Sequence, residues 1–131
     1  MHRFTIADAR ILLALYSADK SAEISCEELI ASCADGNQPL PTWSELAEAF
    51  NKFLYISTID LNGDKVILGN FGRDIIDAAH SKTDGELRSD ELAVLVFKGL
   101  AGYKLKSMCK RTVWTQAQYQ QEIDSRRDNC K

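Results

Sequence analysis

Residues 42–79 read TWSELAEAFNKFLYISTIDLNGDKVILGNFGRDIIDAA, and this stretch decides the fold of the chain. It begins with the pattern Thr42-Trp-Ser-Glu45, a capping box whose two outer side chains satisfy free backbone amides at a helix start. Apolar residues then recur at spacings of three and four, as on one face of an amphipathic helix. They are Trp43, Leu46, Phe50, Phe53 and Leu54. We therefore expect a helix that starts after Thr42 and ends before Ser57.

The residues after this helix predict a β-hairpin. Two short runs, 57–61 and 64–68, flank the dipeptide Asn62-Gly63. Asn-Gly is favoured in a two-residue type I′ turn, because both central residues of that turn need positive φ. Such a turn places residues of the two strands in direct pairs. The expected pairs are Asp60 with Lys65 and Ile59 with Val66.

Five further helices are expected. Thr5-Ile-Ala-Asp8 is close to a capping box, and Ile6–Ala18 is apolar on most sides, which is typical of a buried helix. Ser25-Cys-Glu-Glu28 is a full capping box that starts a short helix ending near Ala34. The remaining helices are expected over Arg73–Ala79, from Ser89 to about Met108, and from Thr115 onward. The patterns therefore predict a mainly α fold with a small β-hairpin.

Charge and polarity divide the chain. We expect a first domain over residues 1–80, a polar linker over 81–89 and a C-terminal helical extension over 90–131. Residues 1–90 contain eight Lys/Arg and fifteen Asp/Glu, whereas residues 91–131 contain eight Lys/Arg and four Asp/Glu. Such asymmetry between the two halves of a chain is informative about its partners.

The order of the expected elements resembles the winged-helix superfamily, with three helices ahead of a hairpin. The passage from the third helix into the first strand is similar to a recognition helix running into the wing. It runs through Leu46, Phe50, Phe53, Leu54 and Ile59. Leu68 followed by Gly72 is similar to the strand-to-helix exit of many bacterial winged-helix regulators. The resemblance covers about residues 5–80 and implies a binding module.

The surface that such a module would present carries more acid than base. The predicted outer face of the helix carries Ser44, Glu45, Glu48, Asn51, Lys52 and Tyr55, and the hairpin carries Asp60, Asp64 and Lys65. Double-stranded DNA is bound largely by neutralising its phosphates with Lys and Arg, so this surface opposes DNA. Residues 34–41 are also a longer connection than the 3–4-residue turn of DNA-reading helix pairs. We therefore expect a protein partner. The alternative is a DNA-binding transcriptional regulator in which Asn51 and Lys52 reach base edges.

The stretch from Leu92 to Gln121 has no acidic residue. Its bases are Lys98, Lys104, Lys106, Lys110 and Arg111, and its aromatic residues include Phe97, Tyr103 and Trp114. Bases interleaved with aromatics can bind single-stranded nucleic acid, which gives a second alternative function, or mark a membrane-surface helix. Apolar residues at helical spacing are more often core, so we expect packing on the first helix or on a second subunit, as in a homodimer. These residues are Leu92, Leu95, Val96, Leu100 and Tyr103.

No catalytic or cofactor motif is found in the sequence. The four cysteines form no Cys-x-x-Cys pair and are expected to be reduced thiols. The run Asp60-Leu-Asn-Gly-Asp64 imitates a calcium loop, but Lys65 and Phe71 occupy the positions that need glycine and glutamate. The strictly apolar run Leu92–Phe97 is far shorter than the roughly 20 residues of a membrane span. We expect a non-enzymatic, cytoplasmic interaction or regulatory module that needs no metal or cofactor and does not bind membranes.

Overall fold

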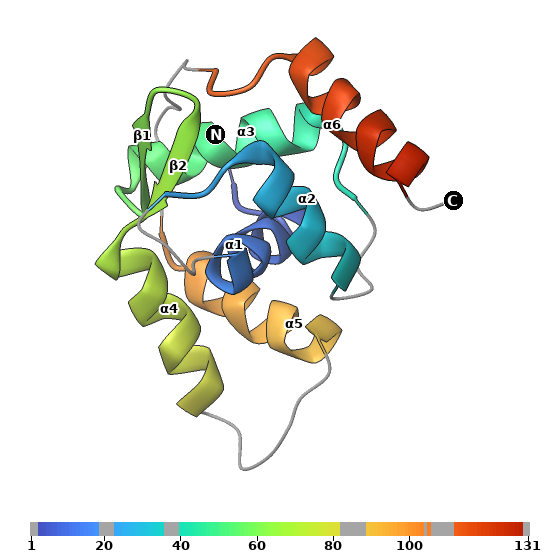
Figure 1. Cartoon of the computed structure of the whole chain (residues 1–131). Coiled ribbons are helices and arrows are strands. Elements are labelled where there is room, and N and C mark those ends of the chain that lie inside the picture. Colours follow the sequence, from blue (N-terminus) through green and yellow to red (C-terminus); the bar gives the residue numbers. More distant parts are fainter. Residues whose placement is uncertain are drawn as a thin grey trace.

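The computed structural model describes residues 3–18, 23–35, 40–81, 89–103, 105 and 112–129 (Figure 1). Within these ranges the chain forms helices and one two-stranded antiparallel hairpin, which confirms the predicted mainly α fold with a small β-hairpin. The elements in order are α1 (Ile6–Ala18), α2 (Cys26–Asp35), α3 (Trp43–Tyr55), β1 (Ile59–Asn62), β2 (Lys65–Leu68), α4 (Asn70–Ser81), α5 (Ser89–Leu100) and α6 (Gln116–Asn129).

Helix α1 lies at the centre of the fold. It packs against α2, α3, α4 and α5, which surround it in Figure 1. Ala9, Leu12 and Leu15 are fully buried, so side chains on several sides of α1 enter the core. A helix that is apolar on most sides is stable only when other elements cover it. The predicted buried helix is therefore confirmed.

Local backbone chemistry sets both ends of α3. At its start, Glu45 N donates to Thr42 Oγ1 at 3.1 Å and Thr42 N donates to Glu45 Oε1 at 2.9 Å, the predicted capping box. At its end, Ser57 N donates to the Leu54 carbonyl at 3.2 Å and Thr58 N donates to the Phe53 carbonyl at 3.0 Å. This pair of bonds is a Schellman motif, which requires a left-handed residue after the helix. Ser57 takes that conformation, with a φ of 61°.

The hairpin forms, but its register differs from the prediction. The observed pairs are Ile59 with Leu68, Asp60 with Ile67, Leu61 with Val66 and Asn62 with Lys65. The two turn residues are therefore Gly63 and Asp64. Of these two only Gly63 has positive φ, at 63°, as in a type II′ turn. The predicted type I′ turn was wrong.

Burial explains why the observed register is preferred. It places Leu61 opposite Val66, and Ile59 opposite Leu68, so the apolar residues share one face of the hairpin. The predicted register would have placed Leu61 opposite the carboxylate of Asp64. The expected pairs of Asp60 with Lys65 and of Ile59 with Val66 were therefore wrong.

A short bridge attaches the other edge of β2 to the segment between α1 and α2. Ile24 N donates to the Val66 carbonyl at 2.7 Å, and Val66 N donates to the Ile24 carbonyl at 2.9 Å. Strand β2 thus lies between β1 and Ile24, whose side chain is fully buried. The sequence patterns did not predict this contact.

Helix α4 begins three residues earlier than predicted, at Asn70. Gly72 therefore lies in the first turn of α4, where its backbone closely approaches Thr58, a residue that follows α3. A Cβ at Gly72 would lie 3.0 Å from the Thr58 carbonyl oxygen and 2.9 Å from Leu68 Cδ1. Only glycine allows this approach, and it places α4 directly beside the hairpin.

The C-terminal residues share the core of residues 1–80. Helix α5 packs on α1 and α4, and α6 packs on α2. One cluster of buried residues contains side chains from both parts of the chain. The C-terminal members are Ala93, Val96, Leu100, Leu105, Trp114 and Tyr119. Helix α5 ends at Leu100, short of the predicted Met108, and the predicted linker lies outside the described residues except for Ser81 and Ser89.

The conformation of Ser57 leads to a stability prediction. Because a left-handed φ strains every residue except glycine, Ser57→Gly should raise the free energy of unfolding by about 1 kcal/mol. Urea denaturation monitored by circular dichroism measures this change. The control is Glu48→Gly in the exposed middle of α3, which should lower stability by roughly 0.5–1 kcal/mol. A Ser57→Gly protein no more stable than the parent would contradict the strain argument.

Candidate interaction surface

A buried ion pair joins the start of α1 to α3. Lys52 Nζ lies 3.0 Å from Asp8 Oδ2, and the two residues are only 6% and 2% exposed. The same Asp8 oxygen accepts a hydrogen bond from Thr5 N at 2.7 Å, as part of the predicted cap of α1. A buried carboxylate needs a partner of opposite charge, and the long lysine side chain reaches it from α3.

This ion pair corrects the prediction for Lys52. The sequence placed Lys52 on the outer face of the helix, as a residue that could touch a partner or a base edge. The structure buries its ammonium group instead. Lys52 is the only lysine or arginine in α3, so no free cation is left on that helix.

The other predicted residues of α3 divide between two sides. Ser44, Glu48, Asn51 and Tyr55 follow one another at spacings of three and four, which places them on one face. Ser44, Glu48 and Tyr55 are exposed, and Asn51 is half-buried. Glu45 lies on another side, where it lines a pocket of about 130 Å³ together with Arg10 and Cys33. Glu45 is thus separated from the face that carries Glu48.

The hairpin presents two exposed carboxylates. Asp60 lies on β1 and Asp64 in the turn, and both are exposed, whereas Lys65 is half-buried. Asn62, opposite Lys65, donates a hydrogen bond to Glu23 from the segment before α2. We use the name α3–hairpin surface for Ser44, Glu48, Asn51, Tyr55, Asp60, Asp64 and Lys65. It carries three carboxylates and one lysine.

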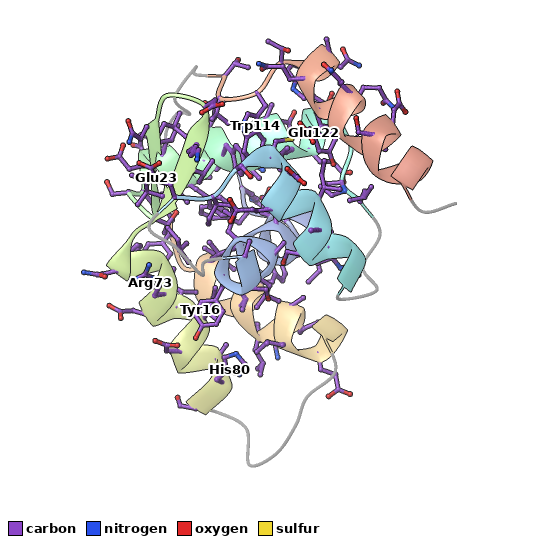
Figure 2. The ribbon with its side chains drawn as sticks, in the orientation of Figure 1. Tyr16, Glu23, Arg73, His80, Trp114 and Glu122 are labelled. Carbon is purple, nitrogen blue, oxygen red and sulfur yellow. The ribbon has the colours of Figure 1, made fainter. Side chains whose placement is uncertain are left out.

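Trp114 connects the hairpin turn to α3 through two hydrogen bonds and a ring contact. Its Nε1 donates to the Asp64 carbonyl at 2.6 Å, and its own carbonyl accepts from Trp43 Nε1 at 2.9 Å (Figure 2). Its ring meets Phe50 edge-on with centroids 5.4 Å apart. Trp114 is 4% exposed, so its ring is not available to stack on a nucleic-acid base. Trp114 therefore cannot supply the base stacking that the nucleic-acid alternative would use.

The residues predicted for self-association are largely used within the chain. Val96 and Leu100 are fully buried on the side of α5 that packs on the rest of the fold. Leu92 and Leu95 are half-buried, and Tyr103 is 38% exposed with its ring 5.2 Å from that of Phe71. Val96 and Leu100 cannot contact a second subunit without unpacking the core. Of the predicted self-association set, the exposed residue is Tyr103.

Most of the predicted basic surface lies outside the described residues. Lys98 is exposed on α5. The others, Lys104, Lys106, Lys110 and Arg111, are not described by the structure. Apart from Asp8 and Lys52, the described side chains include twelve carboxylates and five lysines or arginines. The described surface is therefore acidic.

Two cysteines are buried as free thiols. Burial raises the pKa of the Cys26 thiol to about 12, with a smaller contribution from the charge of Glu122, and burial also raises the pKa of Cys33. A thiol with such a raised pKa holds little of the nucleophilic thiolate near neutral pH. Cys26 and Cys33 are thus core residues.

Two further properties of the described ranges concern metals and membranes. Across these ranges no three His, Cys, Asp or Glu side chains gather closely enough to hold a metal ion. None of the helices there combines the length and the apolar character that crossing a membrane requires.

Comparison with known proteins gives no relative. No protein-family model matches the chain, and neither a curated protein nor a solved structure matches it. The function must therefore be inferred from the residues of the chain itself.

The buried ion pair predicts a large loss of stability when one partner is removed. Lys52→Met should lower the free energy of unfolding by about 3–5 kcal/mol, because it leaves the Asp8 carboxylate buried without its cation. Glu48→Met, an exposed position on the same helix, should change stability by less than about 0.5 kcal/mol. In a double-mutant cycle, Asp8→Asn should cost much less when Lys52 is already methionine. Equal losses for Lys52→Met and Glu48→Met in urea denaturation would contradict the prediction.

Trp114 predicts a local effect on the hairpin. Trp114→Phe keeps an aromatic ring beside Phe50 but removes the donor to Asp64, so it should cost about 1 kcal/mol and speed amide exchange in residues 62–66. The control is Tyr119→Phe, which removes a hydrogen bond of similar kind to the Pro41 carbonyl, at 2.7 Å. Hydrogen exchange measured by NMR should show faster hairpin exchange in the first variant alone. Unchanged exchange in Trp114→Phe would show that Trp114 does not hold the turn.

Proposed function

We propose that this chain is a non-enzymatic, cytoplasmic interaction module of the winged-helix type that binds a basic segment of a protein partner through the α3–hairpin surface. The observation that carries the proposal is the pairing of Lys52 with Asp8. This pairing buries the only cation of α3. The α3–hairpin surface is then left with three carboxylates and one lysine, Lys65.

The arrangement of elements supports the winged-helix part of the proposal. Three helices, α1 to α3, precede a hairpin whose far strand leads at once into α4. In a module of this type, α3 and the hairpin are the parts that meet a partner. Both carry exposed polar side chains here.

Charge supports a protein partner over duplex DNA. A protein that binds DNA gains affinity from each phosphate that a lysine or arginine neutralises. The α3–hairpin surface offers one half-buried lysine for this purpose, and its carboxylates repel phosphates. The same carboxylates can each accept charge-assisted hydrogen bonds from lysine or arginine side chains. A basic protein segment therefore fits this surface better than a polyanion.

Tyr55 supports the same conclusion. It is 38% exposed at the end of α3, on the face that carries Glu48. Tyrosine is enriched at protein–protein interfaces, because it combines a large apolar ring with a polar hydroxyl group. An exposed tyrosine among carboxylates suits a partner that presents arginine, whose flat guanidinium stacks on aromatic rings.

Charge reversal at matched sites tests the proposal. The probe is a fluorescein-labelled peptide of alternating arginine and glycine, and its binding to the full chain is followed by fluorescence polarisation at low salt. Reversing Glu48 and Asp60 together to lysine should weaken binding about tenfold or more, because both charges lie on the α3–hairpin surface. Reversing Glu27 and Asp124 together, exposed on α2 and α6, should weaken it by less than about threefold. Equal losses in the two double variants would contradict the proposed site.

A mobility-shift assay separates this function from its alternatives. Random duplex DNA at low salt should not be retarded by micromolar protein. A shift would favour the DNA-binding regulator. Retention on heparin that is lost when Lys104, Lys106, Lys110 and Arg111 become alanine would favour nucleic-acid binding by the basic stretch.

A further inference from the structure

A groove runs between α4 and α5, and none of its lining residues belongs to the α3–hairpin surface. In Figure 1 these two helices lie at the opposite end of the fold from α3 and α6. The groove has a volume of about 290 Å³. Its main lining residues are Phe71, Ile75 and Ala78 from α4, Leu95 and Gly99 from α5, and Tyr103.

Small residues leave the groove open. Ala78 and Gly99 stand on its opposite walls. A Cβ at Gly99 would lie 3.4 Å from Ile75 Cγ2, so the two helices approach closely at that point. At one end, the rings of Phe71 and Tyr103 meet edge-on at 5.2 Å. The result is an apolar depression closed at one end by aromatic rings.

A negative charge lies at the rim of the groove. Asp74 is the charged residue among its lining side chains, and it is exposed. On α5, Glu91 and Lys98 lie four residues before and three residues after Leu95, so both are on the groove side of that helix. Of these three charged residues, Asp74 lines the groove itself. A cationic group on an occupant would be favoured beside Asp74.

The position of the groove between two helices and its apolar lining suit a helix as its occupant. Its α4 wall runs from Phe71 to Ala79, which spans about 12 Å at the rise of an α-helix. A groove between two helices with an apolar floor is the kind of site in which amphipathic helices of partner proteins dock. A little over two turns of an incoming helix would cover this length.

We propose that the α4–α5 groove is a docking site for an amphipathic helix of a protein partner, whose apolar stripe fills the groove and whose lysine or arginine pairs with Asp74. This site is independent of the α3–hairpin surface. It gives the chain a second contact region, selective for apolar side chains combined with positive charge.

A second copy of the chain does not offer such a helix in its described part. The large apolar residues exposed there are Leu40, Tyr55, Val94 and Tyr103. They lie on separate elements, so they form no apolar stripe along one helix. The proposal therefore takes a different protein as the partner, and sedimentation of the chain tests the alternative of a second copy.

The test uses two synthetic peptides on the full chain. The first is a fluorescein-labelled 14-residue peptide with leucines at helical spacing and lysines at the other positions. The second has glutamate in place of each lysine. The lysine peptide should bind at least about tenfold more tightly than the glutamate peptide. Asp74→Asn should weaken its binding several-fold, whereas Glu48→Gln on the α3–hairpin surface should not.

The most direct test is a variant whose larger side chain fills the groove. Gly99→Leu should weaken binding of the lysine peptide about tenfold or more, because the new side chain occupies the groove. The matched control is Gly102→Leu, where an added Cβ meets no atom within 4 Å and which does not line the groove. Ala78→Leu fills the groove from its other wall and should weaken binding equally. Circular dichroism melting confirms that each variant is folded.

Three outcomes would overturn the proposal. One is equal binding to the Gly99→Leu and Gly102→Leu proteins. The second is equal binding of the lysine and glutamate peptides. The third is self-association of the unmodified chain in sedimentation that Gly99→Leu abolishes, which would make the groove a contact between copies. A loss of binding with Glu48→Gln alone would place the peptide on the α3–hairpin surface and leave the proposed function intact.

Discussion

Two charges removed from water constrain the whole arrangement. The carboxylate of Asp8 helps to cap α1, and the ammonium of Lys52 neutralises it from α3, at 3.0 Å. Separating the two helices would leave a charge in the core, so the pair fixes how α1 and α3 lie against each other. The remaining helices then cover α1. The same pair sets the charge of the outer face of α3, which links the packing of the core to the charge of that surface.

The C-terminal third of the chain completes this arrangement. Helix α5 covers α1 and α4, and Trp114 connects the hairpin turn to α3. Because Trp114 and its neighbours cover one side of α3 and the core covers another, a narrow stripe of that helix is left at the surface. The part of α3 that stays exposed is the face of Ser44, Glu48 and Tyr55, which is the part that the proposed function uses.

Local chemistry was predictable from the sequence, and long-range contacts were not. The capping boxes at Thr42, Ser25 and Thr115 each involve residues three apart, and all three form. Helical spacing predicts that Lys52 is exposed. Its burial could not be foreseen, because its partner Asp8 lies 44 residues away in the sequence. The donor of Trp114 finds its acceptor 50 residues away. The hairpin register depended on which residues become buried, which the Asn-Gly signal alone does not reveal. Helical and hairpin spacing correctly predicted that Glu48, Asp60 and Asp64 are exposed.

The position of α1 affects how the protein is made. Residues 6–18 leave the ribosome before residues 89–100, which form α5, the helix that covers them most extensively. Until that segment has been synthesised, the apolar sides of α1 lack their final cover. A nascent chain with exposed apolar surface is prone to aggregate and attracts chaperones. Translation speed between α1 and α5 should therefore influence how much native protein a cell obtains.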